Sequence, residues 1–252
     1  MSALIFIHGT GGDAASWDPV IPLLSSRYRP IAYDRRGYGR THAAHAEDAR
    51  AILDERAPGE AALVVGSSAG AIVALHLALL APERVRGLVL AEPPLHARNA
   101  RDLRMLGGMI SYVWHSARGR RREAVASFFR TVTRYAGGGN GFDAMTAQQR
   151  ERALGHADDV AAEMRTGTGE DLTHARLATI RCPTTLLLGT RSAPLFARLG
   201  RPLAAAIPQL RTATVAGAGH LMMMEAPRAF ADAVIAADVI AADTAPPSSP
   251  AA

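Results

Sequence analysis

Short apolar runs alternate along the chain with longer segments whose apolar residues recur at helical spacing. The runs cover residues 3–7, 28–33, 62–65, 87–91, 184–188 and 212–216. They are rich in Val, Ile and Leu without polar alternation, which is typical of parallel strands buried on both faces. Helical patterns occupy residues 16–25, 43–55, 69–80 and 225–242. The alternation predicts an α/β fold with a mostly parallel sheet and helices on both faces.

The segment 95–178 interrupts this rhythm. It contains Gly107-Gly108, Gly137-Gly138-Gly139 and amphipathic helical stretches, without a convincing strand. We interpret it as a helical cap inserted into a core made of residues 1–94 and 179–243. The last residues, 244–252, are rich in proline and serine, and we expect this tail to be disordered.

Composition narrows the classes of chemistry. The chain has 252 residues, of which 48% are hydrophobic, and its 28 basic residues against 23 acidic ones give a net charge of +5. All the basic residues are arginine, and the absence of lysine excludes Schiff-base chemistry and a P-loop lysine. The lone cysteine, Cys182, excludes an intramolecular disulfide and a cysteine-paired zinc site. We expect no cofactor and no metal.

We expect no targeting or membrane-spanning segment. Its start lacks a basic region, and the longest apolar stretch, 69–81, is shorter than the roughly 20 residues that cross a bilayer. Residues 98–134 hold nine arginines against Asp102 and Glu123, which we interpret as a solvated face, with an anionic substrate, a carrier-protein thioester or nucleic acid as alternatives. We expect a cytoplasmic protein with a small-molecule substrate, no nucleic-acid partner and no membrane contact. Its oligomeric state is left open.

One pentapeptide carries the candidate chemistry. Gly66-Ser67-Ser68-Ala69-Gly70 follows an apolar run and precedes a helical one. A sharp strand-to-helix turn of this kind exposes the central hydroxyl and points a helix N-terminus at developing negative charge. The sequence therefore singles out Ser68, against the alternative of a glycine-rich turn without chemistry.

Two glycine-rich loops complete the pattern. His8-Gly9-Thr10-Gly11-Gly12 follows the first run, and Gly217-Ala218-Gly219-His220 follows the last. Acyl transfer needs backbone N–H donors for an oxyanion, and the candidates are those of Thr10 and Ala69. His220 lies on a loop between small residues, from which it can reach a serine.

These motifs, in this order, resemble those of the α/β-hydrolase superfamily, in its serine-nucleophile, carboxylesterase-like branch. The resemblance extends to Trp17-Asp18-Pro19-Val20, to the stretch 33–40 and to Cys182-Pro183-Thr184. It implies that Ser68 is the nucleophile, that His220 is the general base and that the insertion covers the active site. Family members usually begin with an antiparallel strand pair, so we expect the N-terminal strands to be truncated.

The acid departs from the family pattern. The resemblance places an aspartate after the run 184–188, where this chain has Ser192. We expect Glu92 to be the acid instead, because it ends a neighbouring apolar run. Certain haloalkane dehalogenases of this superfamily take their acid from the same strand end. Asp34 is a less favoured alternative, and we expect Glu225 to cap the final helix.

The resemblance implies a serine hydrolase that cleaves a carboxylic ester, thioester or lactone through an acyl-enzyme. Flexible methionines and nearby apolar residues indicate an adaptable pocket for small apolar acyl groups, with Met109, Trp114 and Leu221 as candidate substrate contacts. Two alternatives stay open: a non-catalytic, ligand-binding member of the fold and a cofactor-free lyase or cyclase.

Overall fold

The computed structural model describes residues 1–36, 39–97 and 102–244. Its centre is a six-stranded sheet with the order β2-β1-β3-β4-β5-β6, and all the strand pairs are parallel. The strands are β1 (Ser2–Ile7), β2 (Tyr28–Ala32), β3 (Ala62–Ser67), β4 (Val85–Ala91), β5 (Thr184–Gly189) and β6 (Leu210–Val215). Each coincides with one of the six apolar runs, so the α/β class expected from the sequence is confirmed.

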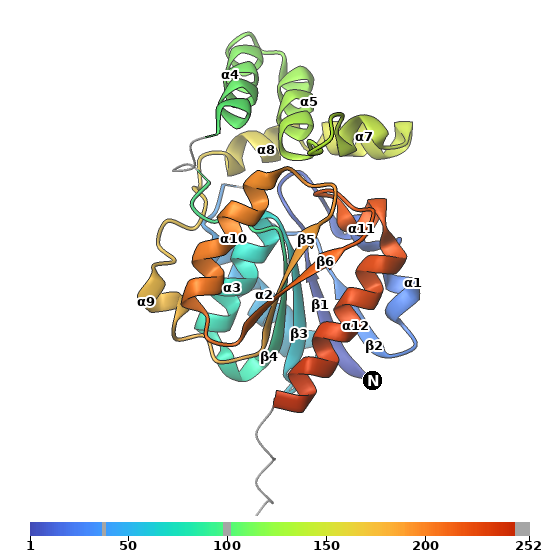
Figure 1. Cartoon of the computed structure of the whole chain (residues 1–252), viewed down its shortest axis with the longest axis vertical. Coiled ribbons are helices and arrows are strands. Elements are labelled where there is room, and N and C mark those ends of the chain that lie inside the picture. Colours follow the sequence, from blue (N-terminus) through green and yellow to red (C-terminus); the bar gives the residue numbers. More distant parts are fainter. Residues whose placement is uncertain (37–38, 98–101, 245–252) are drawn as a thin grey trace, which may run out of the picture.

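Helices cover both faces of the sheet (Figure 1). On one face, α2 (His42–Arg56), α3 (Ala69–Leu80) and α10 (Pro194–Ala206) enclose a core cluster that includes Ile5, Val64 and Leu90. On the other face, α1 (Ile21–Leu24) and α12 (Pro227–Thr244) enclose a second cluster around Phe6, Trp17 and Phe230. The central strands are therefore buried on both sides, which explains their continuous hydrophobic character.

Two local expectations are wrong. The helix expected at 16–25 is split into η1 (Ala14–Trp17) and α1, because Pro19 interrupts the segment between them and Pro22 occupies the first turn of α1. The strand β6 is not buried on both faces, since it lies at the sheet edge and four of its six residues are exposed. A charged residue, Arg211, occupies this edge, where it discourages pairing with another chain.

The cap lies between β4 and β5. It consists of α4 (Leu103–Ala117), α5 (Arg121–Val132), α6 (Gly141–Ala144), α7 (Ala147–Gly155) and α8 (Ala157–Glu163), followed by α9 (His174–Leu177). Figure 1 shows α4, α5, α7 and α8 above the carboxyl ends of the strands. The remaining short segments are η2 (Pro82–Arg84) and α11 (Met222–Glu225). No helix within the described ranges is both long and apolar enough to span a bilayer, and the tail predicted to be disordered lies outside those ranges except for Thr244.

Four buried histidines predict acid sensitivity of the fold. His8, His42, His45 and His76 are each at least 95% buried. Burial, assisted by the charge of Arg35, lowers the pKa of His8 to about 3, and burial lowers the pKa of His42 and of His45 to about 4. Burial also lowers the pKa of His76.

The unfolded chain therefore binds more protons than the folded one once the pH falls below about 6.5. We expect the free energy of unfolding to fall from pH 6.5 to pH 4, by about 1.4 kcal/mol per pH unit for each histidine that gains a proton. Urea unfolding at pH 7.5, 6.0 and 5.0 measures this slope. An unfolding free energy that stays constant down to pH 5 would contradict the prediction.

Candidate active site

Ser68 lies at the turn between β3 and α3 with φ 53° and ψ −122°, a conformation that L-residues rarely adopt. The backbone N–H of Ser68 donates to the carbonyl of Ala91, and its own carbonyl accepts from Ala71. Small residues are required around the turn: a Cβ on Gly66 would come within 2.5 Å of the Gly70 carbonyl oxygen, and a Cβ on Gly70 would collide with the carbonyl of Ile7. Packing against β1 and α3 thus holds the serine in its strained conformation.

The two candidate oxyanion donors flank this serine. Thr10 is in the loop after β1, which approaches so closely that a Cβ on Gly9 would lie 3.0 Å from the Cβ of Ser68. Ala69 opens α3, where first-turn N–H groups have no helical partner. Among the described backbone hydrogen bonds outside helices and strands, none uses the N–H of Thr10 or of Ala69. Both groups are therefore available to a ligand oxygen.

His220 is paired with Glu92. The Nδ1 atom of His220 lies 2.7 Å from Oε2 of Glu92, and both side chains are almost fully buried. The second carboxylate oxygen of Glu92 accepts from the backbone N–H of Gly189 at 2.9 Å. Phe196 stacks on the imidazole with ring centroids 4.2 Å apart. The histidine thus has a fixed ring plane and one nitrogen committed to a carboxylate, which leaves Nε2 for a reacting group.

Glu92 reaches this position through its backbone. It follows the last residue of β4 with φ 44°, and its N–H donates to the carbonyl of Leu187 on the neighbouring strand β5. Pro93 follows, and the φ of 44° lies outside the extended region that a residue before proline favours, so Glu92 is held in a strained conformation. The side chain is thereby turned across the ends of β4 and β5 toward His220.

The other acidic residues considered from the sequence, Asp34 and Glu225, accept hydrogen bonds from backbone N–H groups of loops. Asp34 accepts a hydrogen bond from the N–H of Ala14 at 2.7 Å, which fastens the segment after the glycine-rich loop. Glu225 belongs to α11 and accepts from the N–H groups of Gly219 and Leu221, on either side of His220. The expectation that Glu225 caps the final helix is therefore wrong. Ser192 lies just beyond β5 with its hydroxyl buried, and no partner for it is found within the described part of the chain.

A cavity of about 310 Å³ lies between this constellation and the cap. Ser68, His220, Thr10 and Leu221 all line it. The cap lines the cavity with apolar and polar residues in equal number, and the deeper loops add Trp17 and two methionines. The apolar lining includes Trp17, Phe128, Phe129, Val132, Met145, Leu221, Met223 and Met224, and the polar lining from the cap consists of Thr133, Gln148, Gln149, Arg152 and His156. Met109 and Trp114 lie outside it. Met109 packs within the cap cluster, and the side chain of Trp114 faces solvent.

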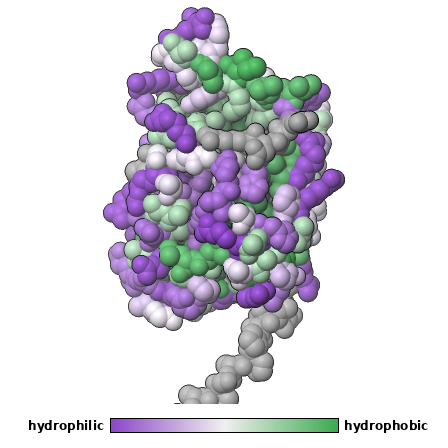
Figure 2. Space-filling view, turned by 90° about the vertical axis from the view of Figure 1, so that its left-hand side faces the viewer, coloured by the Kyte–Doolittle hydropathy of each residue, from purple (hydrophilic) through white to green (hydrophobic). Residues whose placement is uncertain are grey.

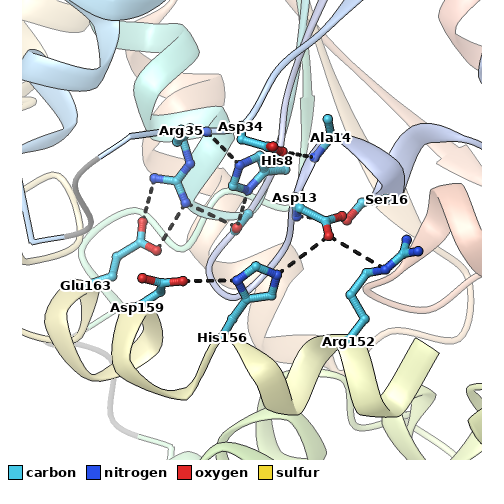
Figure 3. A network of polar contacts seen from close by, with 11 residues as sticks. His8, Asp13, Ala14, Ser16, Asp34, Arg35, Arg152, His156, Asp159 and Glu163 are labelled. Carbon is cyan, nitrogen blue, oxygen red and sulfur yellow. Dashed lines mark hydrogen bonds and ion pairs between the residues drawn. The ribbon is translucent and has the colours of Figure 1, made fainter. Parts of the chain in front are cut away.

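A buried ion pair connects the cap to the loop that carries Thr10 (Figure 3). Arg35, just after β2, binds both carboxylate oxygens of Glu163 on α8 at 2.7 and 3.1 Å. Its Nη2 also donates to the carbonyl of Gly9 at 3.1 Å, and its backbone N–H donates to Nε2 of His8. Since Nε2 of His8 accepts, its Nδ1 carries the proton and donates to the same Gly9 carbonyl at 2.9 Å.

This anchoring orients the candidate oxyanion donor. The Gly9 carbonyl also accepts from the N–H of Gly12, so several donors fix its direction. In a trans peptide the C=O of one residue and the N–H of the next point to opposite sides. Fixing the Gly9 carbonyl toward Arg35 and His8 therefore turns the N–H of Thr10 away from them. Sequence inspection missed Arg35 and Glu163, because 128 positions separate them.

A second contact joins the same loop to the cap (Figure 3). Asp13 lies 3.7 Å from Arg152 on α7 and 3.6 Å from His156, and His156 in turn pairs with Asp159 of α8. The stretch 33–40, noted for its family resemblance, includes Arg35, whereas its residues Gly37 and Tyr38 lie outside the described ranges. The cap thus contacts the glycine-rich loop through two charged clusters.

Part of this chain is similar in sequence to curated hydrolases. A putative carbamate hydrolase RutD from Variovorax paradoxus (strain S110) is 39% identical over 117 residues, which cover 41% of this chain and 44% of that protein. A pimeloyl-[acyl-carrier protein] methyl ester esterase from Photobacterium profundum is 42% identical over 91 residues, or 35% of each chain. The alignments thus span less than half the length of these curated relatives.

The similarity in structure is more extensive. The carboxylesterase CesB (YbfK) from Bacillus subtilis superposes with a TM-score of 0.72, covers 93% of this chain and 82% of its own, and is 20% identical, which shows a common fold. The family model described as "Alpha/beta hydrolase family" matches residues 4–233. With its parallel sheet, its serine at the β3–α3 turn and its histidine after the last strand, this chain belongs to the alpha/beta hydrolase family.

Proposed function

We propose that this protein is a serine hydrolase that cleaves a carboxylic ester, thioester or lactone of a small apolar acyl substrate through an acyl-enzyme. The observation that carries the proposal is a serine and a histidine on one cavity, with a buried carboxylate behind the histidine. A strained serine opens a helix, a histidine lines the same cavity, and that histidine is held by a carboxylate at 2.7 Å. This combination of nucleophile, base and orienting acid is what covalent acyl transfer requires.

In the proposed reaction, Oγ of Ser68 attacks the acyl carbonyl carbon and its proton passes to Nε2 of His220. Glu92 stabilises the resulting imidazolium through Nδ1. The tetrahedral oxyanion accepts from the N–H groups of Thr10 and Ala69, each of which contributes about 10²–10³ in rate by analogy with other oxyanion donors. His220 then protonates the departing alcohol or thiol, and water releases the acyl group by the same route in reverse.

The cavity supports an apolar acyl group of modest size. Its volume is about 310 Å³, at the lower end of the range for small-molecule sites. Phenylalanine and methionine side chains form much of its wall, and thioethers adapt to varied shapes. The names of two similar proteins support ester cleavage, since they are a methyl ester esterase and a carboxylesterase.

Labelling with a fluorophosphonate probe tests the proposal. The probe phosphonylates a serine only where a base and an oxyanion hole activate it, so we expect stoichiometric labelling of the purified protein and a modified peptide that contains Ser68. Ser68→Ala should abolish both labelling and the hydrolysis of p-nitrophenyl butyrate. Ser67→Ala is a matched control, because it removes the neighbouring hydroxyl from the same turn.

Three results would contradict the proposal. An unlabelled protein that still binds apolar acyl compounds would be a ligand-binding member of the fold. If Ser67→Ala abolished labelling and Ser68→Ala did not, the nucleophile would be Ser67 and our assignment of Ser68 would be wrong. A protein that turns over a substrate without Ser68 but requires His220 would instead fit a cofactor-free lyase or cyclase.

A further inference from the structure

The outermost helix of the cap carries an exposed apolar stripe. On α4, five residues face solvent with exposed fractions from 45% to 86%: Leu103, Leu106, Ile110, Val113 and Trp114. At 100° per residue, these positions fall within about 100° of the helix circumference. We refer to these five side chains as the α4 outer face. Figure 2 shows hydrophobic residues gathered over the upper part of the molecule, where the cap lies.

The α4 outer face is not needed to hold the cap together. The opposite side of α4 packs on α5, with Tyr112 buried and Met109 partly buried in the cap cluster. The outer residues line neither that cluster nor the cavity at Ser68. An apolar stripe of this width on a surface helix normally faces a core or a partner.

The charge around the stripe indicates what the partner is. Residues 103–122 contain five arginines and not one aspartate or glutamate. Arg121 and Arg122 pair with Asp158 and Glu151 of other cap helices, whereas two further arginines lie at Trp114. The guanidinium of Arg118 lies 4.0 Å from the ring centroid of Trp114, and that of Arg120 lies 5.4 Å from it. A tryptophan at the edge of an apolar stripe, with arginines over its ring, is suited to a boundary between an apolar and an anionic region.

We propose that the α4 outer face docks on the surface of an anionic lipid bilayer. The apolar side chains enter the boundary between headgroups and acyl chains, and Arg118 and Arg120 contact lipid phosphates. A second copy that docks through the same face is a poorer occupant, because its own residues 103–122 offer no carboxylate to these arginines. The association is peripheral. It reverses our expectation from the sequence of no membrane contact, and it does not rest on the proposed function.

Tryptophan fluorescence reports this contact directly. The chain has two tryptophans, and Trp17 is fully buried whereas Trp114 is 45% exposed. Vesicles with 70% phosphatidylcholine and 30% phosphatidylglycerol should therefore shift the emission of Trp114 to shorter wavelength. We expect at least tenfold weaker binding to pure phosphatidylcholine vesicles, and loss of binding in 0.5 M NaCl.

Two matched variants locate the surface. Val113→Glu introduces a carboxylate into the α4 outer face and should weaken sedimentation with anionic vesicles at least tenfold. Val239→Glu makes the same change at a similarly exposed valine of α12 and should bind like the unaltered protein. Circular dichroism and thermal unfolding check that both variants are folded.

Three results would overturn the proposal. Equal vesicle binding by both variants would place the contact elsewhere on the chain. A protein that binds no vesicles, and is a dimer that Val113→Glu converts to a monomer, would assign the face to a second copy. A monomer that binds no vesicles would show that the face has no lipid partner.

Discussion

Replacing Glu92 with glutamine should lower kcat for p-nitrophenyl butyrate by about 10⁴-fold, the loss seen when the acid of a serine triad is neutralised. Glutamine keeps the size of the side chain but removes the charge that stabilises an imidazolium on His220. Its amide can also donate to Nδ1, which favours the wrong imidazole tautomer. We expect KM to change little, because Glu92 is buried behind the histidine and does not line the cavity.

Asp34→Asn is the control for this substitution. Asp34 was the alternative acid, and its contact is with the N–H of Ala14. An asparagine oxygen can keep that hydrogen bond, so we expect activity within a few-fold of the unaltered enzyme. The assignment of Glu92 fails if Glu92→Gln retains near-full activity while Asp34→Asn loses it.

Replacing Glu163 with leucine should destabilise the protein by about 3–5 kcal/mol, because Arg35 would then be buried without its carboxylate partner. The side chains of the pair are 0% and 5% exposed, so water does not screen the remaining charge. The free energy of unfolding in urea measures this effect. Glu163→Gln, which keeps an acceptor for the guanidinium, should cost less.

The same α8 helix offers a control pair. Asp158 pairs with Arg121 on the cap surface, where the two side chains are 76% and 69% exposed. Such pairs contribute about 0–1 kcal/mol, so Asp158→Asn should leave the unfolding free energy almost unchanged. If Glu163→Leu and Asp158→Asn changed the free energy of unfolding equally, burial of the pair of Arg35 and Glu163 would not increase its contribution to stability.

The elements of the core could be predicted because their signals are local. The run 62–65, the pentapeptide after it and the helical pattern at 69–80 lie next to one another in the chain, and they form β3, the turn at Ser68 and α3. The pairing of Glu92 with His220 could be predicted from the topology of the sheet, although the two residues are far apart in the sequence. Both residues follow strands of one parallel sheet, and the carboxyl ends of such strands share an edge.

The cap was less predictable, because helical periodicity shows which residues share a face but not what that face meets. Met109 and Trp114 were expected at the substrate, yet α4 directs Met109 toward α5 and Trp114 toward solvent. The pair of Arg35 and Glu163 was invisible for a related reason. It joins a loop of the core to a helix of the insertion, and no local pattern specifies that contact.

The hydrogen bonds that Glu92 makes to β5 determine from which strands a carboxylate can reach His220. Its backbone N–H donates to the carbonyl of Leu187, and its carboxylate accepts from the N–H of Gly189. The carboxyl ends of β4 and β5 are therefore held side by side by hydrogen bonds of a single residue. A negative charge supplied from either strand would reach the same imidazole without any change of topology. The carboxylate that follows β4 therefore fills the position that the family pattern assigns to an acid after β5, where this chain has Ser192.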